Sequence, residues 1–234
     1  MRSSKWQALG NVYLLVEQAD ALTPQRAREL SSDTDGVLEV HGHGVTVWNP
    51  DGSIAEMSGN GARIAAAWLA RNTGTTDVTL TVGVRDVSAH VSGDLVTLDV
   101  GRVDAGEPET IDVDGEQVEF VPVSVGNPHA VVRRDPADVR QLGPLLEHHP
   151  RFPGRTNVQL IHVDGEHDLT VAVWERGAGE TLSSGTSAVA AAAAAIARGW
   201  CTSPVTVHMP GGDLSVELDA NGEARLTGPV VELA

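Results

Sequence analysis

Residues 57–69 read M-S-G-N-G-A-R-I-A-A-A-W-L, and a related stretch at residues 183–195 reads S-S-G-T-S-A-V-A-A-A-A-A-A. Aligned without gaps, Ser58 meets Ser184, an offset of 126 residues. Each copy is a short polar turn that leads directly into an alanine-rich segment, and alanine is the strongest helix former. The same turn before the same kind of helix indicates an internal duplication, which helix-capping preference alone does not predict.

The start of each predicted helix has the properties of an anion-binding site. The first backbone N–H groups of a helix lack intrahelical partners, and the aligned peptide dipoles place partial positive charge there. Gly59 and Gly185 allow a ligand to approach that backbone closely. The alternative is that Ser58, Asn60 and Thr186 are ordinary capping residues. The duplication favours binding, with two turns suited to one anionic substrate.

Length and composition indicate a globular protein of two domains. A chain of 234 residues can form two domains of roughly 100 to 130 residues, each with its own core. Hydrophobic residues make up 41% of the chain, which is typical of a folded protein and not of a disordered one. The net charge of -16 argues against general binding to nucleic acid or to anionic membranes.

Cysteine and signal patterns predict a cytoplasmic protein. Cys201 is the single cysteine, which excludes an intramolecular disulfide framework and a multi-cysteine metal site, and we expect it to be a packed structural thiol. Residues 1–11 lack the apolar core of a signal peptide, and no apolar run reaches the roughly 18 residues of a membrane helix. His41 with His43, and His148 with His149, are weak metal-binding patterns that we interpret as loop histidines, so no metal site is predicted.

Short strands dominate the periodicity, and each half contains one alanine-rich helix. Further helices are predicted at residues 23–30, where Thr23 is the cap, and at residues 136–147. A change to an acidic, Gly- and Pro-bearing composition at residues 101–109 places the domain boundary so that the domains span residues 1–104 and 105–234. The predicted class is α+β, with strands wrapped around each alanine-rich helix. The predicted strands are residues 12–17, 37–40, 45–48, 78–82, 84–91, 95–100, 118–125, 130–133, 157–163, 169–174, 205–209, 214–218 and 224–227.

Polar residues gather in the predicted loops at strand ends. Turn chemistry alone explains an asparagine in a turn. Glu175 and Arg176 are more suggestive, because a guanidinium after an apolar strand suits bidentate binding of a carboxylate, with a structural ion pair as the alternative. The loop residues are Asn11, Asn49, Asn127, His129, Asn157, Glu175 and Arg176, together with the two serine turns.

Several segments resemble the diaminopimelate epimerase family, a group of cofactor-independent amino-acid epimerases. The matching segments extend over nearly the whole chain. They are K-W-Q-A-L-G-N-V-Y-L-L-V, W-N-P-D-G-S-I-A-E-M-S-G-N-G-A-R, S-V-G-N-P-H-A-V, R-T-N-V-Q-L and W-E-R-G-A-G-E-T-L-S-S-G-T-S-A, the last of which is highly specific. The resemblance implies two pseudo-symmetric domains, each a mixed β-barrel around a central helix, with the tail near residues 225–234 returning to the first domain.

The same resemblance implies roles for the loop residues. The distal amino-acid end of diaminopimelate is expected to contact Asn49, Asn127, Asn157 and Arg176. The reacting end is expected to be surrounded by Asn11, Gly59, Asn60, Glu175, Gly185 and Thr186, with its carboxylate between the two helix N-termini. His129 and Glu175 are expected to assist the two acid/base positions.

The chain departs from the family pattern at those two acid/base positions, where cysteines are replaced by Ser58 and Ser184. A cysteine thiol has a pKa near 8.5, whereas an alcohol is close to the value of about 15.7 for water. If free thiolate and alkoxide were the bases, the difference of roughly 7 units would correspond to about 10 kcal/mol. Serine acts as a base when a neighbour accepts its proton, so Ser58 with His129 and Ser184 with Glu175 are candidate relays.

We therefore expect an isomerase that converts LL-diaminopimelate to the meso form for lysine and cell-wall precursor synthesis, without pyridoxal phosphate, another cofactor or a metal. The expected partner is this small substrate, with a homodimer as a further expectation and with neither nucleic acid nor membrane. Three explanations of the serines stay open: natural serine relays, engineered cysteine replacement, and a relative that lost or changed its chemistry. The alternative functions are another amino-acid epimerase or dehydratase and a non-catalytic diaminopimelate-binding protein.

Overall fold

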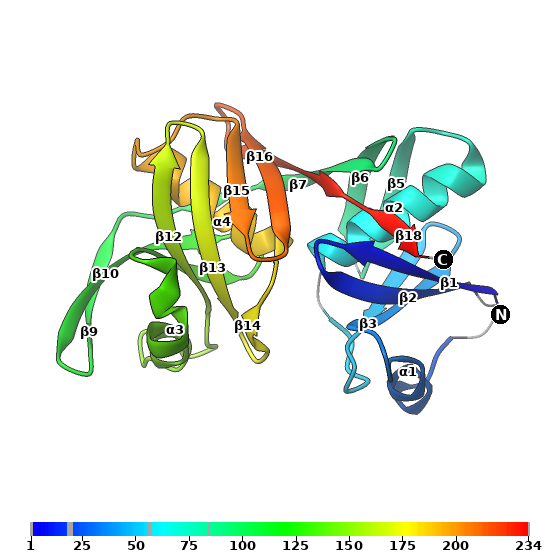
Figure 1. Cartoon of the computed structure of the whole chain (residues 1–234), viewed down its shortest axis with the longest axis horizontal. Helices are drawn as coiled ribbons and strands as arrows, with labels where there is room; N and C mark the ends of the chain where they lie inside the picture. The colour runs from blue at the N-terminus through cyan, green and yellow to red at the C-terminus, as the bar shows by residue number, and fades with distance from the viewer. Residues whose placement is uncertain (1, 18–20, 56–57, 84, 234) are drawn as a thin grey trace. The chain divides into compact units, whose positions relative to one another are not determined.

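The computed structural model describes residues 2–17, 21–55, 58–83 and 85–233; Met57 and Val84, which belong to segments discussed above, lie outside the described residues. Contacts divide the chain into two compact units. Unit 1 comprises Met1–Asp99 and Thr227–Ala234, and unit 2 comprises Val100–Leu226. Both units are rich in strands and contain few helices (Figure 1), so the predicted α+β class is confirmed.

In unit 1, parallel and antiparallel strand pairs alternate. β1 pairs antiparallel with β2, β2 parallel with β3, β3 antiparallel with β4, β4 parallel with β5, and β5 antiparallel with β6. β7 pairs antiparallel with β6, and the late strand β18 pairs antiparallel with β1. These strands are β1 (Arg2–Ala8), β2 (Asn11–Glu17), β3 (Gly36–His41), β4 (Gly44–Trp48), β5 (Asp77–Val82), β6 (Arg85–Ser92), β7 (Leu95–Arg102) and β18 (Val231–Leu233).

Helix α2 (Gly59–Thr73) is the first alanine-rich helix and supplies the centre of the main core of unit 1. Ile64 is fully buried and Leu69 is 4% exposed, in a cluster with Leu38 and Leu80. The helix ends at Gly74, whose φ of 72° is the left-handed conformation that glycine adopts without a steric penalty. Small alanine side chains allow strands β1 to β6 to lie close to this helix.

Helix α1 (Pro24–Leu30) covers a second, smaller core of unit 1. Thr23 accepts a hydrogen bond from the Arg26 N–H at 3.2 Å, and Pro24 occupies the first helical position, as predicted. Ala27 packs with Val16 and Trp48 in this core.

In unit 2, the same alternation of strand pairs recurs. β10 pairs antiparallel with β11, β11 parallel with β12, β12 antiparallel with β13, β13 parallel with β15, and β15 antiparallel with β16. Three further strands join these: β8 and β9 pair with β10, and β14 pairs with β13. The strands are β8 (Asp104–Ala105), β9 (Glu109–Val113), β10 (Glu116–Ser124), β11 (Pro128–Arg133), β12 (Asn157–Gly165), β13 (Asp168–Glu175), β14 (Gly179–Thr181), β15 (Val205–Met209), β16 (Gly212–Leu218) and β17 (Glu223–Pro229), the last of which continues into unit 1.

Helix α4 (Gly185–Ala197) is the second alanine-rich helix, and it is buried on all sides. Residues 188–195 are each at most 1% exposed, which requires side chains as small as alanine wherever strands approach. Strands β10, β11, β12, β13, β15 and β16 all contact it. Cys201, just beyond the helix, is 5% exposed, in agreement with the predicted structural thiol.

The predicted helix at residues 136–147 is divided. Pro136–Asp138 form a short 3-10 turn, and α3 (Val139–Glu147) follows with Pro144 inside it. A proline cannot donate the backbone hydrogen bond of a regular helix interior, which limits α3 to a short segment. Leu142 and Leu146 of α3 pack in a hydrophobic core of unit 2 that also contains Phe120.

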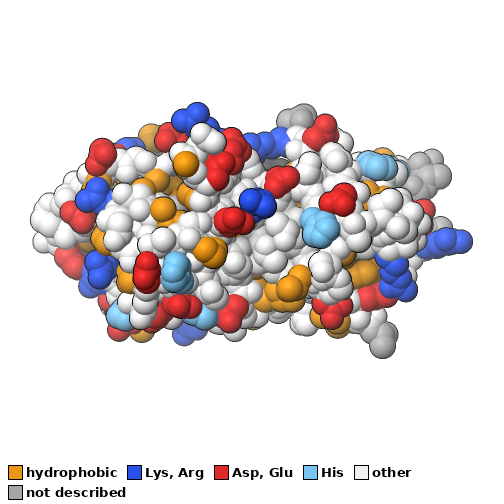
Figure 2. Space-filling view, turned by 90° about the horizontal axis from the view of Figure 1, so that it is seen from above, with side chains coloured by type: hydrophobic (Ala, Val, Ile, Leu, Met, Phe, Trp, Pro, Cys, Tyr) orange, Lys and Arg blue, Asp and Glu red, His pale blue; other side chains and the backbone are white. Residues whose placement is uncertain are grey.

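Acidic side chains are spread across the molecular face seen in Figure 2, as the net charge of -16 predicts. None of the helices in the described ranges is both long enough and apolar enough to span a membrane.

Candidate functional site

Ser58 occupies the position before the first turn of α2, in an extended conformation with φ -135° and ψ 115°. Its Oγ accepts a hydrogen bond from the Gly61 N–H at 3.0 Å and lies 3.2 Å from the phenol oxygen of Tyr13. A Cβ at Gly61 would lie 2.9 Å from a Leu38 methyl carbon and 3.2 Å from Ser58 Oγ, so the close packing of this turn requires glycine. The Ser58 hydroxyl is thus fixed at the helix N-terminus.

The side chains of Asn11 and Asn60 form a direct hydrogen bond. Asn60 Nδ2 donates to Asn11 Oδ1 at 2.8 Å, and Asn60 Oδ1 accepts from Arg63 Nη2 at 2.7 Å. Asn11 begins β2 after a tight turn at Leu9 and Gly10, whose φ angles of 50° and 84° suit the turns that connect antiparallel strands. The turn therefore directs Asn11 toward the first residues of α2.

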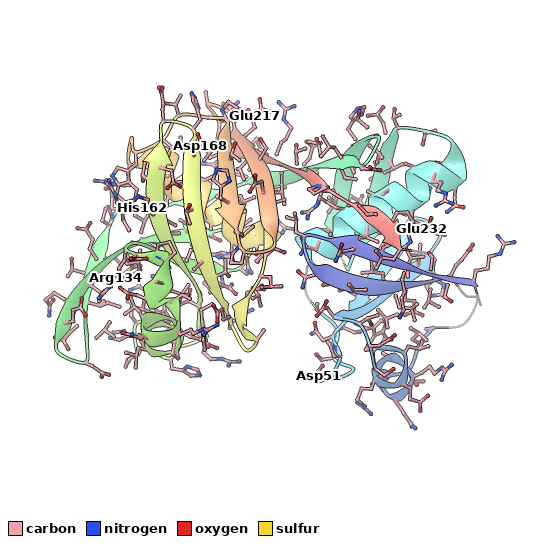
Figure 3. The ribbon with its side chains drawn as sticks, in the orientation of Figure 1. Asp51, Arg134, His162, Asp168, Glu217 and Glu232 are labelled. Carbon is pink, nitrogen blue, oxygen red and sulfur yellow. The ribbon has the colours of Figure 1, made fainter. Side chains whose placement is uncertain are left out.

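Asn49 belongs to the turn after β4. Its backbone N–H donates to the Ser53 carbonyl at 2.8 Å, and its Nδ2 donates to Ser53 Oγ at 2.9 Å. Asp51, labelled in Figure 3 at this loop, accepts from the Ser53 N–H and hydroxyl at 2.8 and 2.6 Å. The predicted Asn-Pro-Asp-Gly turn is confirmed, and it constrains the position of the Asn49 side chain.

Ser184 is the counterpart of Ser58, but its side chain has a different partner. The Ser184 hydroxyl donates to Glu175 Oε2 at 3.1 Å, and among the described residues it makes no capping hydrogen bond to α4. Burial raises the pKa of the Glu175 carboxyl above its ordinary value, and the Ser184 hydrogen bond partly opposes this. The pair therefore joins an alcohol to an unusually basic carboxylate. Gly185 and Thr186 form the first positions of α4 beside it.

His129 in β11 is 1% exposed, and both of its ring nitrogens have partners. Nε2 lies 2.9 Å from Asn127 Oδ1, and Nδ1 lies 3.0 Å from Gln159 Nε2. Since an amide oxygen accepts and an amide nitrogen donates, the ring is neutral with its proton on Nε2. Burial lowers the His129 pKa to about 3; the Gln159 hydrogen bond opposes this shift, and the positive charge of Arg176 adds to it. His129 is therefore uncharged at neutral pH.

Asn157 connects the ends of three strands. Its Nδ2 donates to the Pro128 carbonyl at 3.0 Å, and its Oδ1 accepts from the Arg176 N–H at 3.0 Å. The parallel register of β11 and β12 places His129 opposite Asn157. Unit 2 thus brings together the predicted residues Asn127, His129, Asn157, Glu175, Arg176 and Ser184 at neighbouring strand ends and at the start of α4.

Glu147 supports the loop that carries Arg176. Its carboxylate accepts from Trp174 Nε1 at 2.8 Å, from the Gly177 N–H at 2.8 Å and from Arg155 Nη1 at 3.1 Å. Burial alone would raise the Glu147 pKa, but the Trp174 and Gly177 hydrogen bonds, with the nearby positive charges, lower it overall. Glu147 remains an anion at neutral pH and fixes the chain on both sides of residues 175 and 176.

Comparison with known proteins identifies the family. The sequence is 38% identical over 274 aligned positions to a diaminopimelate epimerase from Stutzerimonas stutzeri, covering 100% of this chain and 97% of that relative. The chain belongs to the diaminopimelate epimerase family. A diaminopimelate epimerase from Pseudomonas entomophila is 37% identical over the same shares of both chains, and the family's sequence model matches residues 121–233.

Solved structures share the fold of this family member. A predicted epimerase from Pseudomonas aeruginosa has a TM-score of 0.74 at 18% identity, covering 100% of this chain and 97% of that one. A probable proline racemase from Agrobacterium radiobacter has a TM-score of 0.72 at 14% identity, covering 99% and 91%. At these identities the likeness concerns the fold alone.

Sequence reasoning did not single out Tyr13, Arg63, Glu147 or Gln159. For Tyr13 a signal exists, because it lies two residues after Asn11 on a strand and therefore on the same face of the sheet. Arg63 lies in the quoted stretch, but a single sequence gives no sign that this arginine is fully buried. Glu147 and Gln159 are distant in sequence from the residues that they hold, so only the fold associates them.

Proposed function

We propose that this member of the diaminopimelate epimerase family is an isomerase that converts LL-diaminopimelate to meso-diaminopimelate by proton transfer at one α-carbon. The observation that carries the proposal is full-length similarity to relatives of that name, at 35–38% identity. The geometry supports it, because Ser184 donates to a carboxylate whose pKa is raised by burial. Such a reaction supplies a lysine and cell-wall precursor.

The proposed catalytic residues are Ser58, Ser184, His129 and Glu175. In unit 2, Ser184 removes or returns the α-proton while its own hydroxyl proton passes to or from Glu175, so that a free alkoxide is never formed. His129 is proposed to assist as a neutral hydrogen-bonding group, which its two engaged nitrogens support. The relay between Ser58 and His129 stays a hypothesis, because the two residues belong to different units.

The proposed substrate-binding residues divide by the end of the substrate that they serve. Asn49, Asn127, Asn157 and Arg176 are proposed for the distal end, and Asn11, Gly59, Asn60, Glu175, Gly185 and Thr186 for the reacting end. The partial positive charge at the N-termini of α2 and α4, which begin at Gly59 and Gly185, supports binding of the substrate carboxylate. We propose that no cofactor or metal takes part, since every proposed step uses side chains of this chain.

We further propose two pseudo-symmetric domains, residues 1–104 and 105–234, each a barrel of strands around its alanine-rich helix, with a tail that returns to the first domain. The repeated alternation of parallel and antiparallel pairs supports this symmetry. A cytoplasmic location and a homodimer complete the proposal. Light scattering at several protein concentrations tests the dimer.

Deuterium incorporation at the α-carbon of LL- and meso-diaminopimelate in D₂O, followed by proton NMR, tests the function. The control is the double variant Ser58→Ala, Ser184→Ala. Exchange with inversion that is absent from the control supports an epimerase acting through serine. Saturable binding of diaminopimelate without exchange would instead identify a binding protein that has lost the chemistry.

A further inference from the structure

Two hydroxyl groups meet at the start of α2. Tyr13 lies on β2, on the same face as Leu15, and its ring packs against the main core of unit 1. Its phenol oxygen is 3.2 Å from Ser58 Oγ, and either oxygen can donate. Because Ser58 Oγ also accepts from the Gly61 N–H, a lone pair of Ser58 is already engaged. The Ser58 hydroxyl proton is thus suited to donation to Tyr13.

The position of the Tyr13 ring depends on a glycine in the neighbouring strand. The parallel register of β2 and β3 places Tyr13 opposite Gly36. A Cβ at Gly36 would lie 3.0 Å from Tyr13 Cε1 and 2.5 Å from the Trp48 carbonyl oxygen. The ring therefore occupies space that any other residue at position 36 would fill, and this packing holds the phenol close to Ser58.

A buried cation lies close to this pair. Arg63 is fully buried; Nη2 donates to Asn60 Oδ1, while Nε and Nη1 have no hydrogen-bond partner among the described residues. Burial lowers the Arg63 pKa to about 10, and attraction to the negative charge of an ionised Tyr13 opposes that shift. Arg63 therefore remains positive at neutral pH. Among the residues that the structure describes, no carboxylate pairs with Arg63, and a buried cation without a full counter-charge is unfavourable; the same attraction favours the phenolate form of Tyr13.

We propose that Tyr13 serves as the proton acceptor and donor of Ser58, with Arg63 as the cation that stabilises its phenolate. The proposal rests on the epimerase function proposed above and assigns the partner of the first serine. Ser58 Oγ forms a bond to the α-proton as the Cα–H bond breaks and its electron pair stays on the substrate carbon. At the same time the original hydroxyl proton of Ser58 passes to the Tyr13 phenolate, which becomes a phenol.

The relay accounts for a serine where the family resemblance implies cysteine. A phenol ionises near pH 10 in model peptides, only about 1.5 pH units above a thiol, whereas an alcohol is far weaker as an acid. The Tyr13 phenolate is thus at least as strong a base as a thiolate, and it forms far more readily than a serine alkoxide. In unit 2, Glu175 is the corresponding proton acceptor for Ser184, whose hydroxyl donates to it at 3.1 Å. Ser58 is the group proposed to touch the substrate, and Tyr13 acts through it.

The chain contains one tyrosine, which makes the test specific. Tyr13→Phe removes the phenol oxygen and keeps the ring. We expect kcat for deuterium exchange to fall by about 10² to 10⁴, the usual contribution of an acid/base group, while KM changes less than about threefold. The matched control is Thr97→Val, which removes one member of another hydroxyl pair in unit 1, Thr97 with Thr227 at 2.8 Å, and should leave kcat unchanged.

Replacing tyrosine by 3-fluorotyrosine throughout the protein changes only position 13 and makes its phenol more acidic. In the direction of reaction in which Ser58 removes the α-proton, we expect the acid limb of the kcat/KM profile to move to lower pH, and the single fluorine NMR signal to titrate over the same range as that limb. An unmoved limb, or a Tyr13→Phe enzyme with the kcat of the parent, overturns the relay. This second measurement holds even if Tyr13→Phe fails to fold.

Failure of the relay differs from failure of the epimerase function. A parent protein that exchanges the α-proton, with a Tyr13→Phe variant that exchanges equally fast, overturns the relay alone. A parent protein that neither binds nor exchanges diaminopimelate overturns the function and the relay together. Loss of exchange in Tyr13→Phe with diaminopimelate binding retained supports both.

Discussion

Replacing His129 by glutamine should change how the free energy of unfolding depends on pH. His129 has a folded-state pKa of about 3 against an ordinary value of 6.5. Because the folded pKa is lowered, the unfolded chain binds a proton below pH 6.5 that the folded protein does not bind. The contribution of His129 to stability is therefore present above pH 6.5 and is lost as the pH falls toward 3.

The size of the effect follows from those two values. From pH 7.5 to pH 5.0, the unfolded chain gains nearly one proton at this site and the folded protein gains almost none. At about 1.4 kcal/mol per pH unit below 6.5, the loss at pH 5.0 is about 2 kcal/mol. His129→Gln puts an amide, which can still donate and accept hydrogen bonds, in the place of the imidazole. Because an amide does not titrate, the variant should not lose this stability between pH 7.5 and pH 5.0.

Urea unfolding at pH 7.5 and pH 5.0, for the parent and for His129→Gln, measures the difference. Comparing the two proteins cancels the titration of every other group, including His208, whose pKa is raised by the hydrogen bond to Asp213 and whose contribution has the opposite sign. Parallel pH dependences, within about 0.5 kcal/mol, would show that His129 is not held neutral by the fold. A His129 ring signal in NMR that titrates near pH 6.5 would refute the reasoning directly.

Three further predictions concern unit 2. Glu147→Gln places an amide N–H against the Trp174 and Gly177 N–H groups, which themselves donate. It should reduce the free energy of unfolding by about 2 to 3 kcal/mol in urea titrations and raise KM for diaminopimelate. A loss below about 0.5 kcal/mol would contradict this prediction. Gly143→Ala would place a Cβ 2.6 Å from Trp174 Cγ and should lower the free energy of unfolding by about 1 to 3 kcal/mol. Gly154→Ala is the control, because nothing lies within 4 Å of a Cβ there, and the free energy of unfolding should change little in the same assay. Because the Glu175 pKa is raised, its carboxylate forms only above its ordinary value of 4.5. In the direction of reaction in which Ser184 removes the α-proton, kcat/KM should therefore fall on the acid side at a pH above 4.5, and Glu175→Gln should remove that limb; a limb unchanged in the variant would assign it to another group.

Local sequence signals predicted the helices and most strands well. Thr23 and Pro24 mark the start of α1, and the two serine turns mark the starts of α2 and α4, because capping chemistry acts within a few residues. The turn at residues 49–52 was predictable for the same reason. These features need no information from distant parts of the chain.

Strands whose own residues show little of the strand pattern were not predicted. β1 reads R-S-S-K-W-Q-A and has little alternation of apolar residues, but it pairs with β2 on one side and with β18 on the other. β9 and β14 were not predicted either, and each forms a hairpin with a strand adjacent in sequence, β10 and β13 respectively. Pairing with a partner strand stabilises such strands more than intrinsic preference does.

The candidate site shows the same division between local and long-range information. The motifs indicated Ser184 and Glu175, and the structure places them in hydrogen-bond contact. The motifs gave no indication that the Ser58 hydroxyl contacts the Tyr13 phenol, since 45 residues separate the two in the chain. Nor does a duplicated turn predict that one serine caps its helix while the other binds a carboxylate.

The pairing of β1 with β18 affects the order in which the protein is completed on the ribosome. Lys5 lies opposite Leu233, and Glu232, labelled in Figure 3, forms an ion pair with Arg71 of α2. Unit 2 is one continuous segment that lies between β1 and β18 in the chain, so its strands can pair before β18 is synthesised. During that time the edge of β1 that β18 later covers is open, and open edges favour pairing with other chains. Unit 1 is therefore completed only after unit 2, and until then the open edge of β1 is a place where a chaperone would protect the chain from misassembly.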